Sequence, residues 1–520
     1  MDRDISRRTL LGGAAAISLL APVLAACGSS EKAAEPKTSG PRRGGILKIG
    51  IGEVSTSETL DPVKVTSARN QAWYNNAIYD LLVDVDDKWN LIPQLAKSFE
   101  PSADLKTWTF TLREDVKFHN GAPFTADDAV YSILRHLDKA GGSPSYSRLS
   151  SVLAKNGLKT NGKYQFVATL KVADAFLPLV LSQKWFGMIP AGTTKFDGVG
   201  TGPFSLVSFK PGQSWEVKRN ESYWQSGLPY LDGVQAVAIT EPSTKVLSVT
   251  SGASDLIDDF DYTQVAILKQ ASGVAKIIEV PGAIGPLLAM NMQVAPFDNP
   301  KVREAIKLAY DRQQVINTAY QGRAVVTSDT PCPSTDSYYP KAVGIRGRDV
   351  AKAKSLLAEA GYPDGLKLKL YMSTVVAGAL DFGTVFQQSV KDAGIDVQIK
   401  QWPIATYYDQ PYVNQPFRVS WWYHRHPDTI LPVAYVGDTS DNESHMHDAQ
   451  FEQLLVDARA TADTTKQHDL FEQAYQRIAD DGGVIIPAYA NRLLGVKNNV
   501  NGVQVGFQRD VVLTKTYLSS

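Results

Sequence analysis

The sequence predicts a mixed α/β protein with more than one domain, and three observations lead to this prediction. The 520 residues are too many for a single hydrophobic core, which favours two or three domains. Residues 105–137 change from strand-like alternation to a helical apolar stripe. Residues 366–400 form an α/β unit, with a strand at Leu366–Tyr371, a helix at Leu380–Ala393 and a strand at Ile395–Lys400.

The segment from Leu105 to Tyr131 is the most informative stretch of the chain. Residues 107–112 alternate threonine with large apolar side chains, the period-two pattern of a half-buried strand. A second short strand is expected at 116–119, ended by an Asn120-Gly121 turn. Thr125 is suited to cap a helix because acidic residues follow it in the first turn.

Further elements are predicted along the rest of the chain. Gly200-Thr-Gly202 is interpreted as a structural turn, since no helix follows it and Pro203 lacks the donor that a phosphate cradle needs. The other expected elements are strand 46–51, helix 67–79, a helix capped by Asn299-Pro300, a helix from Asp349 to Ala360, two helices within 447–479, and strand 484–489.

The amino terminus has the features of an export signal. Ser6–Leu11 resembles a twin-arginine motif, and the apolar run Leu10–Leu24 is too short to cross a bilayer. Leu24–Cys27 resembles a lipobox, so residues 1–26 are predicted to be a signal peptide and Cys27 the site of lipid attachment. Residues 27–44 are predicted to be a flexible tether. Cys332 would then be the remaining thiol, which excludes an internal disulfide.

Several motifs together resemble one protein family. They are the Trp108–Asp128 stretch, Leu60-Asp61-Pro62, Gly200–Phe204 followed by Asn220–Trp224, and Asn291–Ile306. Together these motifs are similar to those of the extracytoplasmic solute-binding proteins, family 5, of peptide and nickel ABC transporters. The resemblance covers the chain from about Gly45 to its end.

This resemblance implies a periplasmic-binding-protein-like fold of the cluster C type. Two α/β lobes would face each other across a ligand cleft, with an extra small α+β domain packed on the first lobe. The expected division is 45–80 plus 190–283 plus 485–520 for lobe I, 81–189 for the small domain, and 284–484 for lobe II. The chain would cross between the lobes twice, and hinge closure would bury the ligand.

The resemblance also implies a function outside the cytoplasm. A lipid-anchored, monomeric receptor on the bacterial cell membrane would capture a small solute and deliver it to the transmembrane permease subunits of an ABC importer. Neither catalysis nor a cofactor is expected. The formal net charge of −1 gives no electrostatic reason to expect a nucleic-acid partner.

The stretch Phe417–Asp428 is the expected ligand contact. Many peptide-binding relatives carry Trp-x-x-Asp-Tyr-x-Asp-Pro here, and their first Asp pairs with the α-ammonium group of a peptide. In this chain Trp422 aligns with the Trp and Arg425 with that Asp, so the sign of the charge is inverted. A guanidinium favours a carboxylate, so the hypothesis is an organic anion, aromatic if rings stack on it. The candidate ligand-binding residues are Arg425, Trp421, Trp422, Tyr423, His424, Trp402 and Trp73.

Other interpretations stay open. The 417–428 stretch could be a core strand with Arg425 in solvent, or the ligand could be an oligopeptide or dipeptide. Nickel or haem binding would call on the pairs His424/His426 and His445/His447, although no Cys or Glu cluster completes a coordination shell. An enzyme is disfavoured because Gly-x-Ser-x-Gly, His-Glu-x-x-His, Walker and Cys-x-x-Cys motifs are absent from the sequence.

Overall fold

The computed structural model describes residues 40–64, 68–403, 406–407, 414–437, 441–506 and 510–519. By its contacts the chain separates into two units, Met1–Gly40 and Pro41–Ser520, and the second unit is described below. The predicted signal peptide, the lipobox with Cys27 and most of the tether lie outside the described residues.

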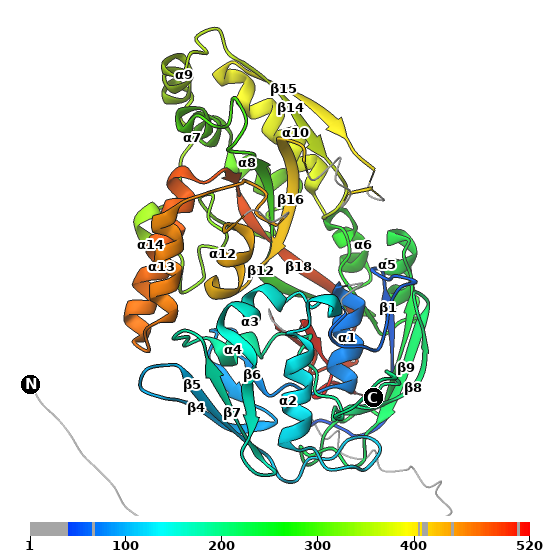
Figure 1. Ribbon diagram of the computed structural model, residues 1–520. Helices are drawn as coiled ribbons and strands as arrows, with labels where there is room; N and C mark the ends of the chain where they lie inside the picture. The colour runs from blue at the N-terminus through cyan, green and yellow to red at the C-terminus, as the bar shows by residue number, and fades with distance from the viewer. Residues whose placement is uncertain are drawn as a thin grey trace, which may run out of the picture. The chain divides into compact units, whose positions relative to one another are not determined.

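A large mixed sheet organises the second unit (Figure 1). In the described part of the chain it has twelve strands; β13 (Ala324–Val326) pairs with β18, and β17 (Val484–Ile485) pairs with β12. The other ten follow the order β15 (Ile395–Gln401), β14 (Leu366–Met372), β16 (Phe417–Tyr423), β12 (Ala275–Met290), β18 (Ala488–Lys497), β11 (Leu256–Ile257), β1 (Ile46–Ile51), β10 (Gly233–Ala238), β9 (Ser214–Arg219) and β8 (Phe204–Lys210).

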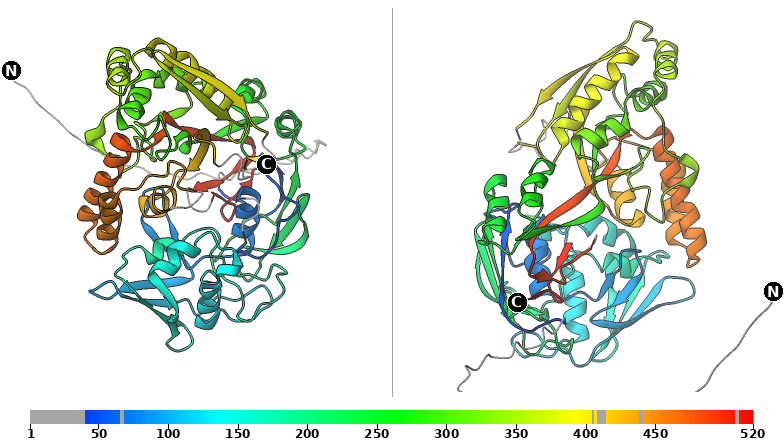
Figure 2. Two further views of the ribbon diagram at one scale, coloured as in Figure 1. Left: turned by 45° about the horizontal axis from the view of Figure 1, so that its top comes forward. Right: turned by 180° about the vertical axis from the view of Figure 1, so that it is seen from behind.

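The strands β12 and β18 connect the two halves of this sheet (Figure 2). Residues 275–280 of β12 pair antiparallel with residues 492–497 of β18. Residues 284–290 of β12 pair instead with β16. One strand therefore belongs to both halves, as two crossings of the chain would require.

The α/β unit predicted at 366–400 is confirmed. Strands β14 and β15 are parallel, and α10 (Ala379–Val390) connects them. Gly394, with φ of 82°, ends the connection in the left-handed conformation that glycine adopts most easily. The apolar residues recur with period 2 in the strands and with period 3.6 in the helix, as the prediction of a strand, a helix and a strand requires.

A smaller antiparallel sheet lies within residues 81–189. Its order is β4 (Ala96–Pro101), β5 (Thr107–Leu112), β7 (Gln165–Leu170) and β6 (Leu153–Thr160), and the hairpin β2 (Val83–Val85) and β3 (Leu91–Pro93) precedes it. Strand β5 confirms the predicted alternation, since its apolar side chains are buried and its threonines are half-buried. The helices of this segment are α2 (Ala126–Arg135), α3 (Tyr146–Val152) and α4 (Leu177–Val180).

The start of α2 is confirmed and the strand expected before it is wrong. Thr125 and Asp128 form a capping box at the helix N-terminus. Residues 116–119 make a single bridge, between Lys117 and Pro123. Pro123 has no N–H for a continuing ladder, and the chain enters α2 three residues later, so a second strand has no room to extend.

The remaining elements cover the faces of the large sheet or pair at its margin. These elements are α1 (Ala68–Ile78), α5 (Pro242–Thr250), α6 (Val265–Gln270), α7 (Pro300–Ala309), α8 (Arg312–Ala319), α9 (Val350–Glu359), α12 (Pro427–Ala434), α13 (Ala449–Arg459), α14 (Thr464–Asp481), β19 (Val500–Asn501), β20 (Gln504–Gly506), β21 (Asp510–Val512) and β22 (Tyr517–Leu518). The cap predicted for α7 is confirmed, because the Asn299 side chain accepts a hydrogen bond from the Lys301 N–H. Within the described ranges, every helix is too short or too polar to cross a membrane.

The Gly200–Pro203 turn has a packing role. A Cβ atom on Gly200 would lie 2.2 Å from the Ile78 carbonyl oxygen, at the end of α1. The Gly202 N–H donates a hydrogen bond to that same oxygen over 2.9 Å. The glycines let the turn approach the helix closely, in agreement with a structural turn.

Apolar clusters support a division of the second unit into parts. One cluster lies within residues 81–188, a second surrounds β1, β9, β10 and α1, and a third covers β14, β15 and α10. We propose to keep the division into lobe I (45–80, 190–283 and 485–520), the small domain (81–189) and lobe II (284–484). The third cluster also takes side chains from α5 and α6, so lobe I and lobe II share core contacts near the sheet centre.

A buried group of four charges joins the 81–189 segment to α12 and α13. Arg148 on α3 contacts the carboxylates of Asp174 and Asp428, each over 2.8 Å, and Arg459 Nε lies 2.5 Å from Asp428 Oδ1. The Ala175 N–H also donates to the Arg459 carbonyl over 2.9 Å. Burial alone would lower the pKa of Arg148, but attraction to the two carboxylates outweighs it and raises that pKa. The Arg148 guanidinium therefore stays protonated, attraction to Arg148 and Arg459 outweighs burial and lowers the pKa of Asp428, and burial raises the pKa of Asp174.

We expect Arg148→Met to lower the free energy of unfolding by roughly 3–5 kcal/mol, because it leaves Asp174 and Asp428 without their shared cation. Lys97→Met is the matched control, since the Lys97–Glu114 pair is exposed and should contribute about 1 kcal/mol at most. Urea denaturation followed by far-UV circular dichroism measures both changes. Equal effects of the two variants would contradict the structural role of the buried group.

Candidate ligand-binding site

A small cavity lies where β16 ends beside the centre of the large sheet. Its volume of about 30 Å³ is enough for one or two water molecules. Basic side chains outnumber acidic ones in its lining, which consists of Lys184, Trp185, Val280, Ala283, Tyr423, His424, Arg425, Arg492, Val505, Gly506 and Asp510.

A β-bulge in β12 shapes one wall of this cavity. The register between β12 and β18 shifts between Val280 and Ile284. Gly282 within the bulge has φ of 65°, and a Cβ atom there would lie 3.1 Å from Cβ of Pro333. Because a bulge turns side chains away from the regular pleat, Val280 and Ala283 both reach the cavity.

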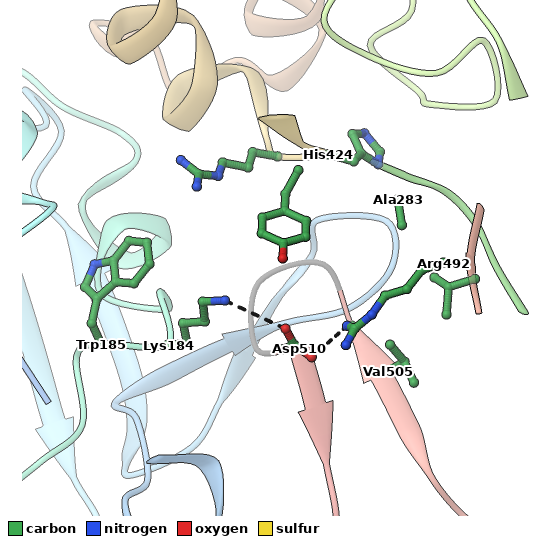
Figure 3. A pocket seen from close by; sticks show the side chains of 11 residues that line it. Lys184, Trp185, Ala283, His424, Arg492, Val505 and Asp510 are labelled. Carbon is green, nitrogen blue, oxygen red and sulfur yellow. Dashed lines mark hydrogen bonds and ion pairs between the residues drawn. The ribbon is translucent and has the colours of Figure 1, made fainter. Parts of the chain in front are cut away.

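Asp510 is the acidic centre of the cavity. Its carboxylate lies 2.6 Å from Arg492 Nη1 and 3.8 Å from Lys184 Nζ, and Figure 3 shows these two cations reaching it from opposite sides. The Trp73 indole donates a third contact, over 3.0 Å. Asp510 has φ of 69°, an uncommon conformation for a residue with a side chain. Strain of this kind is concentrated at functional sites.

Two of the nearby arginines are neutralised by carboxylates. Arg492 contacts Asp259 over 2.5 Å as well as Asp510. Arg69 contacts the other oxygen of Asp259 over 3.0 Å and donates a hydrogen bond to the Tyr423 hydroxyl over 3.1 Å. This chain of alternating charges fixes Tyr423 at the edge of the cavity.

Lys184 and Arg425 are not neutralised in this way. The carboxylate nearest to Lys184 is 3.8 Å away, beyond hydrogen-bonding distance, and burial together with the Arg425 charge lowers the pKa of Lys184 in spite of Asp510. The Arg425 guanidinium lies 5.4 Å from the ring centre of Trp422, and burial lowers its pKa. The Asp441 carboxylate attracts Arg425 and acts against this shift, although it forms no ion pair with Arg425 among the described residues. The cavity therefore carries an excess of positive charge.

The structure brings three of the seven predicted ligand-binding residues into the cavity lining: Tyr423, His424 and Arg425. Trp422 lies beneath the Arg425 guanidinium, and Trp421 packs edge-on against Tyr423 with ring centres 4.8 Å apart. Both tryptophans are half-buried on β16 and support the lining without belonging to it.

Trp73 and Trp402 lie outside the cavity. Trp73 is 1% exposed and acts on the site through its hydrogen bond to Asp510. Trp402 packs against Tyr371 and donates from Nε1 to the Thr406 hydroxyl over 2.9 Å. Neither ring is in the lining of the cavity described above.

Sequence reasoning missed Lys184, Trp185, Arg492 and Asp510. Lys184 and Trp185 are more than 300 residues away from Arg492 and Asp510 in the chain, and none of the four belongs to a recognisable motif. Charged residues beside aromatic ones, as in Lys184-Trp185 and Tyr423-His424-Arg425, are the weak signal that could have indicated them.

A second and larger cavity adjoins the first. Its volume is about 480 Å³, within the usual range for small-molecule sites. Val280, His424 and Val505 line both cavities. The rest of its lining comes from two loops, with Asp87, Lys88 and Trp89 on one and Pro333, Thr335, Asp336 and Ser337 on the other, and from Pro281.

The histidines near the site contact protein groups. His424 Nε2 lies 2.7 Å from Asp336 Oδ2. His426 Nδ1 accepts the Asp428 N–H over 3.1 Å, so its other nitrogen carries the proton and faces the Tyr338 hydroxyl at 3.2 Å. Among the described residues, the group with metal-ligand spacing is His468, Asp469 and Glu472, which includes neither His-x-His pair.

The protonation of His426 should affect stability. Burial lowers its pKa from 6.5 to about 4, so between these values the unfolded chain binds a proton that the folded protein does not. Stability from this group is complete above pH 6.5 and is lost as the pH falls toward 4. His426→Asn keeps an acceptor for the Asp428 N–H but does not titrate, so its unfolding free energy should fall less steeply, by up to about 1.4 kcal/mol per pH unit.

Urea denaturation of both proteins at several values from pH 4 to 7 measures this difference. His136, whose pKa burial lowers to about 3, titrates equally in the two proteins and cancels from the comparison. Parallel curves of stability against pH would contradict the assignment of a neutral, buried His426.

Comparison with known proteins gives a consistent result. A family model described as bacterial extracellular solute-binding proteins, family 5 Middle, matches residues 90–443. The glutathione-binding protein GsiB of Salmonella typhi is 31% identical over 365 residues, which cover 68% of each chain.

Two solved structures extend the likeness to the whole fold. AgaA from A. tumefacien R10, in complex with agropinic acid, is 26% identical, has a TM-score of 0.77, and the match covers 92% of this chain and 99% of AgaA. DppA from Helicobacter pylori, in complex with the peptide STSA, is 26% identical with a TM-score of 0.78 and the same coverage. The expected periplasmic-binding-protein fold is confirmed.

Proposed function

Because this chain belongs to family 5 of the bacterial extracellular solute-binding proteins, we propose that it is the receptor of an ABC importer and that its solute is a small organic anion bearing a carboxylate. The observation that carries the choice of an anion is the pair formed by Lys184 and Arg425. Both cations line the cavity, and neither is within hydrogen-bonding distance of a described carboxylate.

The chemistry of these two groups suits an acid group. A guanidinium binds a carboxylate with two parallel hydrogen bonds, and an ammonium adds a third donor. Burial lowers the pKa of both cations, which means that the protein surroundings disfavour their charge. A bound anion would reverse this effect, whereas a bound cation would add to it.

The relatives include proteins whose names point to acids as well as to peptides. AgaA was solved in complex with agropinic acid and DppA in complex with a peptide, and GsiB is named a glutathione-binding protein. The peptide alternative needs an acidic group for the α-ammonium. In the first cavity that group would be Asp510, but Arg492 and Trp73 already contact its carboxylate. In the adjoining cavity it would be Asp336, which already pairs with His424 over 2.7 Å. The anion therefore remains the better match, and nickel has less support because the metal-ligand group found among the described residues includes neither His-x-His pair.

The other parts of the proposal follow from the sequence and the family. Cys27 would carry the lipid that anchors the receptor outside the cytoplasm, with residues 28–44 as its tether. The partners would be the solute and the transmembrane permease subunits. The receptor would act as a monomer without a cofactor, would not catalyse a reaction, and would release the solute by opening at the hinge.

We expect Arg425→Gln to weaken binding of a carboxylate ligand about 10- to 100-fold, because one charge-assisted contact is worth roughly 1.5–3 kcal/mol. Lys184→Gln should have a smaller effect in the same direction, since an ammonium donates singly. Isothermal titration with the ligand found as described below gives both affinities. Lys159→Gln, on the exposed face of β6, is the control and should bind like the unmodified protein. An unchanged affinity of Arg425→Gln would contradict the anion site.

The ligand itself can be identified by native mass spectrometry of residues 45–520, followed by analysis of the small molecules released on denaturation. A co-purified carboxylate, an aromatic one in particular, would support the proposal. A co-purified peptide would contradict it and would indicate that an acidic group such as Asp510 holds the amine.

A further inference from the structure

We propose that the second cavity holds the body of the ligand while Arg425 and Lys184 hold its acid group, so that the solute is a long, largely apolar acid whose far end reaches solvent. This inference rests on the proposed function, because it takes the first cavity as the acid site. It adds a size class, a second subsite and a direct role for the loop that carries Trp89.

The sizes of the two cavities indicate how the ligand is divided. About 30 Å³ accommodates little more than an acid group, whereas about 480 Å³ accommodates a substantial organic body. Val280, His424 and Val505 line both spaces, so the two cavities meet at these side chains. A small acid such as acetate would leave the larger space to water.

The lining of the second cavity combines an apolar wall, one buried polar pair and an exposed polar edge; the buried pair is Asp336 and His424, whose carboxylate and imidazole lie 2.7 Å apart. Trp89 and Pro333 are buried, and they form an apolar wall with the half-buried Val280 and Val505. Four exposed polar residues also line the cavity and define its mouth: Asp87, Lys88, Thr335 and Ser337. The apolar wall suits methylene groups or a ring, and the mouth tolerates a polar end.

Trp89 is held in a strained and well-defined position. Its φ is 66°, in the left-handed region that bulky side chains rarely adopt. Its indole donates to Asp336 Oδ2 over 3.2 Å, and its ring packs edge-on against His424 with centres 5.5 Å apart. Trp89 lies on the β2–β3 hairpin, whereas Asp336 and His424 come from segments more than 240 residues further along the chain. The strain and these contacts keep an aromatic face against the cavity.

Three probes of known structure test this arrangement by isothermal titration: benzoate, 6-phenylhexanoate and 6-phenylhexan-1-ol. If the second cavity holds the ligand body, 6-phenylhexanoate should bind the unmodified protein at least tenfold more tightly than benzoate, because it buries five more methylene groups. The alcohol should bind more weakly than either acid. Weak or absent binding of both acids would overturn this inference and the proposed anion function together.

Two variants assign the effect to the second cavity. Trp89→Ala should bring the affinity for 6-phenylhexanoate close to that for benzoate and leave benzoate nearly unchanged. Thr335→Trp should block the mouth with the same result, and it does not depend on the strained loop. Trp224→Ala, a half-buried tryptophan that contacts Asp80, is the matched control and should retain the tenfold preference. A preference retained in both Trp89→Ala and Thr335→Trp would overturn the inference.

Arg425→Gln separates this inference from the proposed function. It should weaken both acids by a similar factor and leave their ratio unchanged. If Arg425→Gln has no effect but Trp89→Ala and Thr335→Trp abolish the preference for the longer acid, the anion assignment fails and the second subsite stands.

Discussion

The antiparallel ladder between β12 and β18 is the interaction on which the rest of the structure depends. It lies at the centre of the large sheet. Strand β12 pairs with β18 mainly through residues 275–280 and with β16 through residues 284–290. A regular ladder would point side chains alternately to the two faces and would leave no opening. The bulge between Val280 and Ile284 breaks this regularity at one place, and the cavity forms there.

The buried cations near this bulge are of two kinds, those paired closely with carboxylates and those paired weakly. Around Asp510 and Asp259, each buried arginine contacts two carboxylates or a carboxylate and a hydroxyl, so that the desolvation cost is largely offset. Lys184 and Arg425 are compensated less: Asp510 lies 3.8 Å from Lys184, Asp441 attracts Arg425 from beyond ion-pair distance, and burial outweighs both attractions and lowers the two pKa values. An uncompensated charge in a folded protein is a stored cost that a ligand of opposite sign can relieve. We propose that this contrast in pairing, rather than the total charge of the cavity, separates the ligand-binding cations from the structural ones.

Sequence reasoning recovered most of the fold, and three of its seven candidate residues are among the eleven that line the first cavity, for physical reasons. Elements with a strong local signal were found, such as β5 with its alternation and α7 with its Asn299-Pro300 cap. The false strand at 116–119 shows the limit of pattern alone, because burial alternates there although no partner strand is available. Arg425 was found through its place in a motif. Lys184 and Asp510 could not be found, because they reach the cavity from segments more than 300 residues apart, and only the tertiary fold brings them together.

The four buried charges around Arg148 have a consequence for how the 81–189 segment can move away from α12. Arg148 and Asp174 belong to this segment, whereas Asp428 and Arg459 belong to α12 and α13. A movement that breaks the Arg148–Asp428 contact while the groups stay buried would leave charges unpaired in the interior, which costs several kcal/mol. We therefore expect the segment to move together with α12 and α13 as one body.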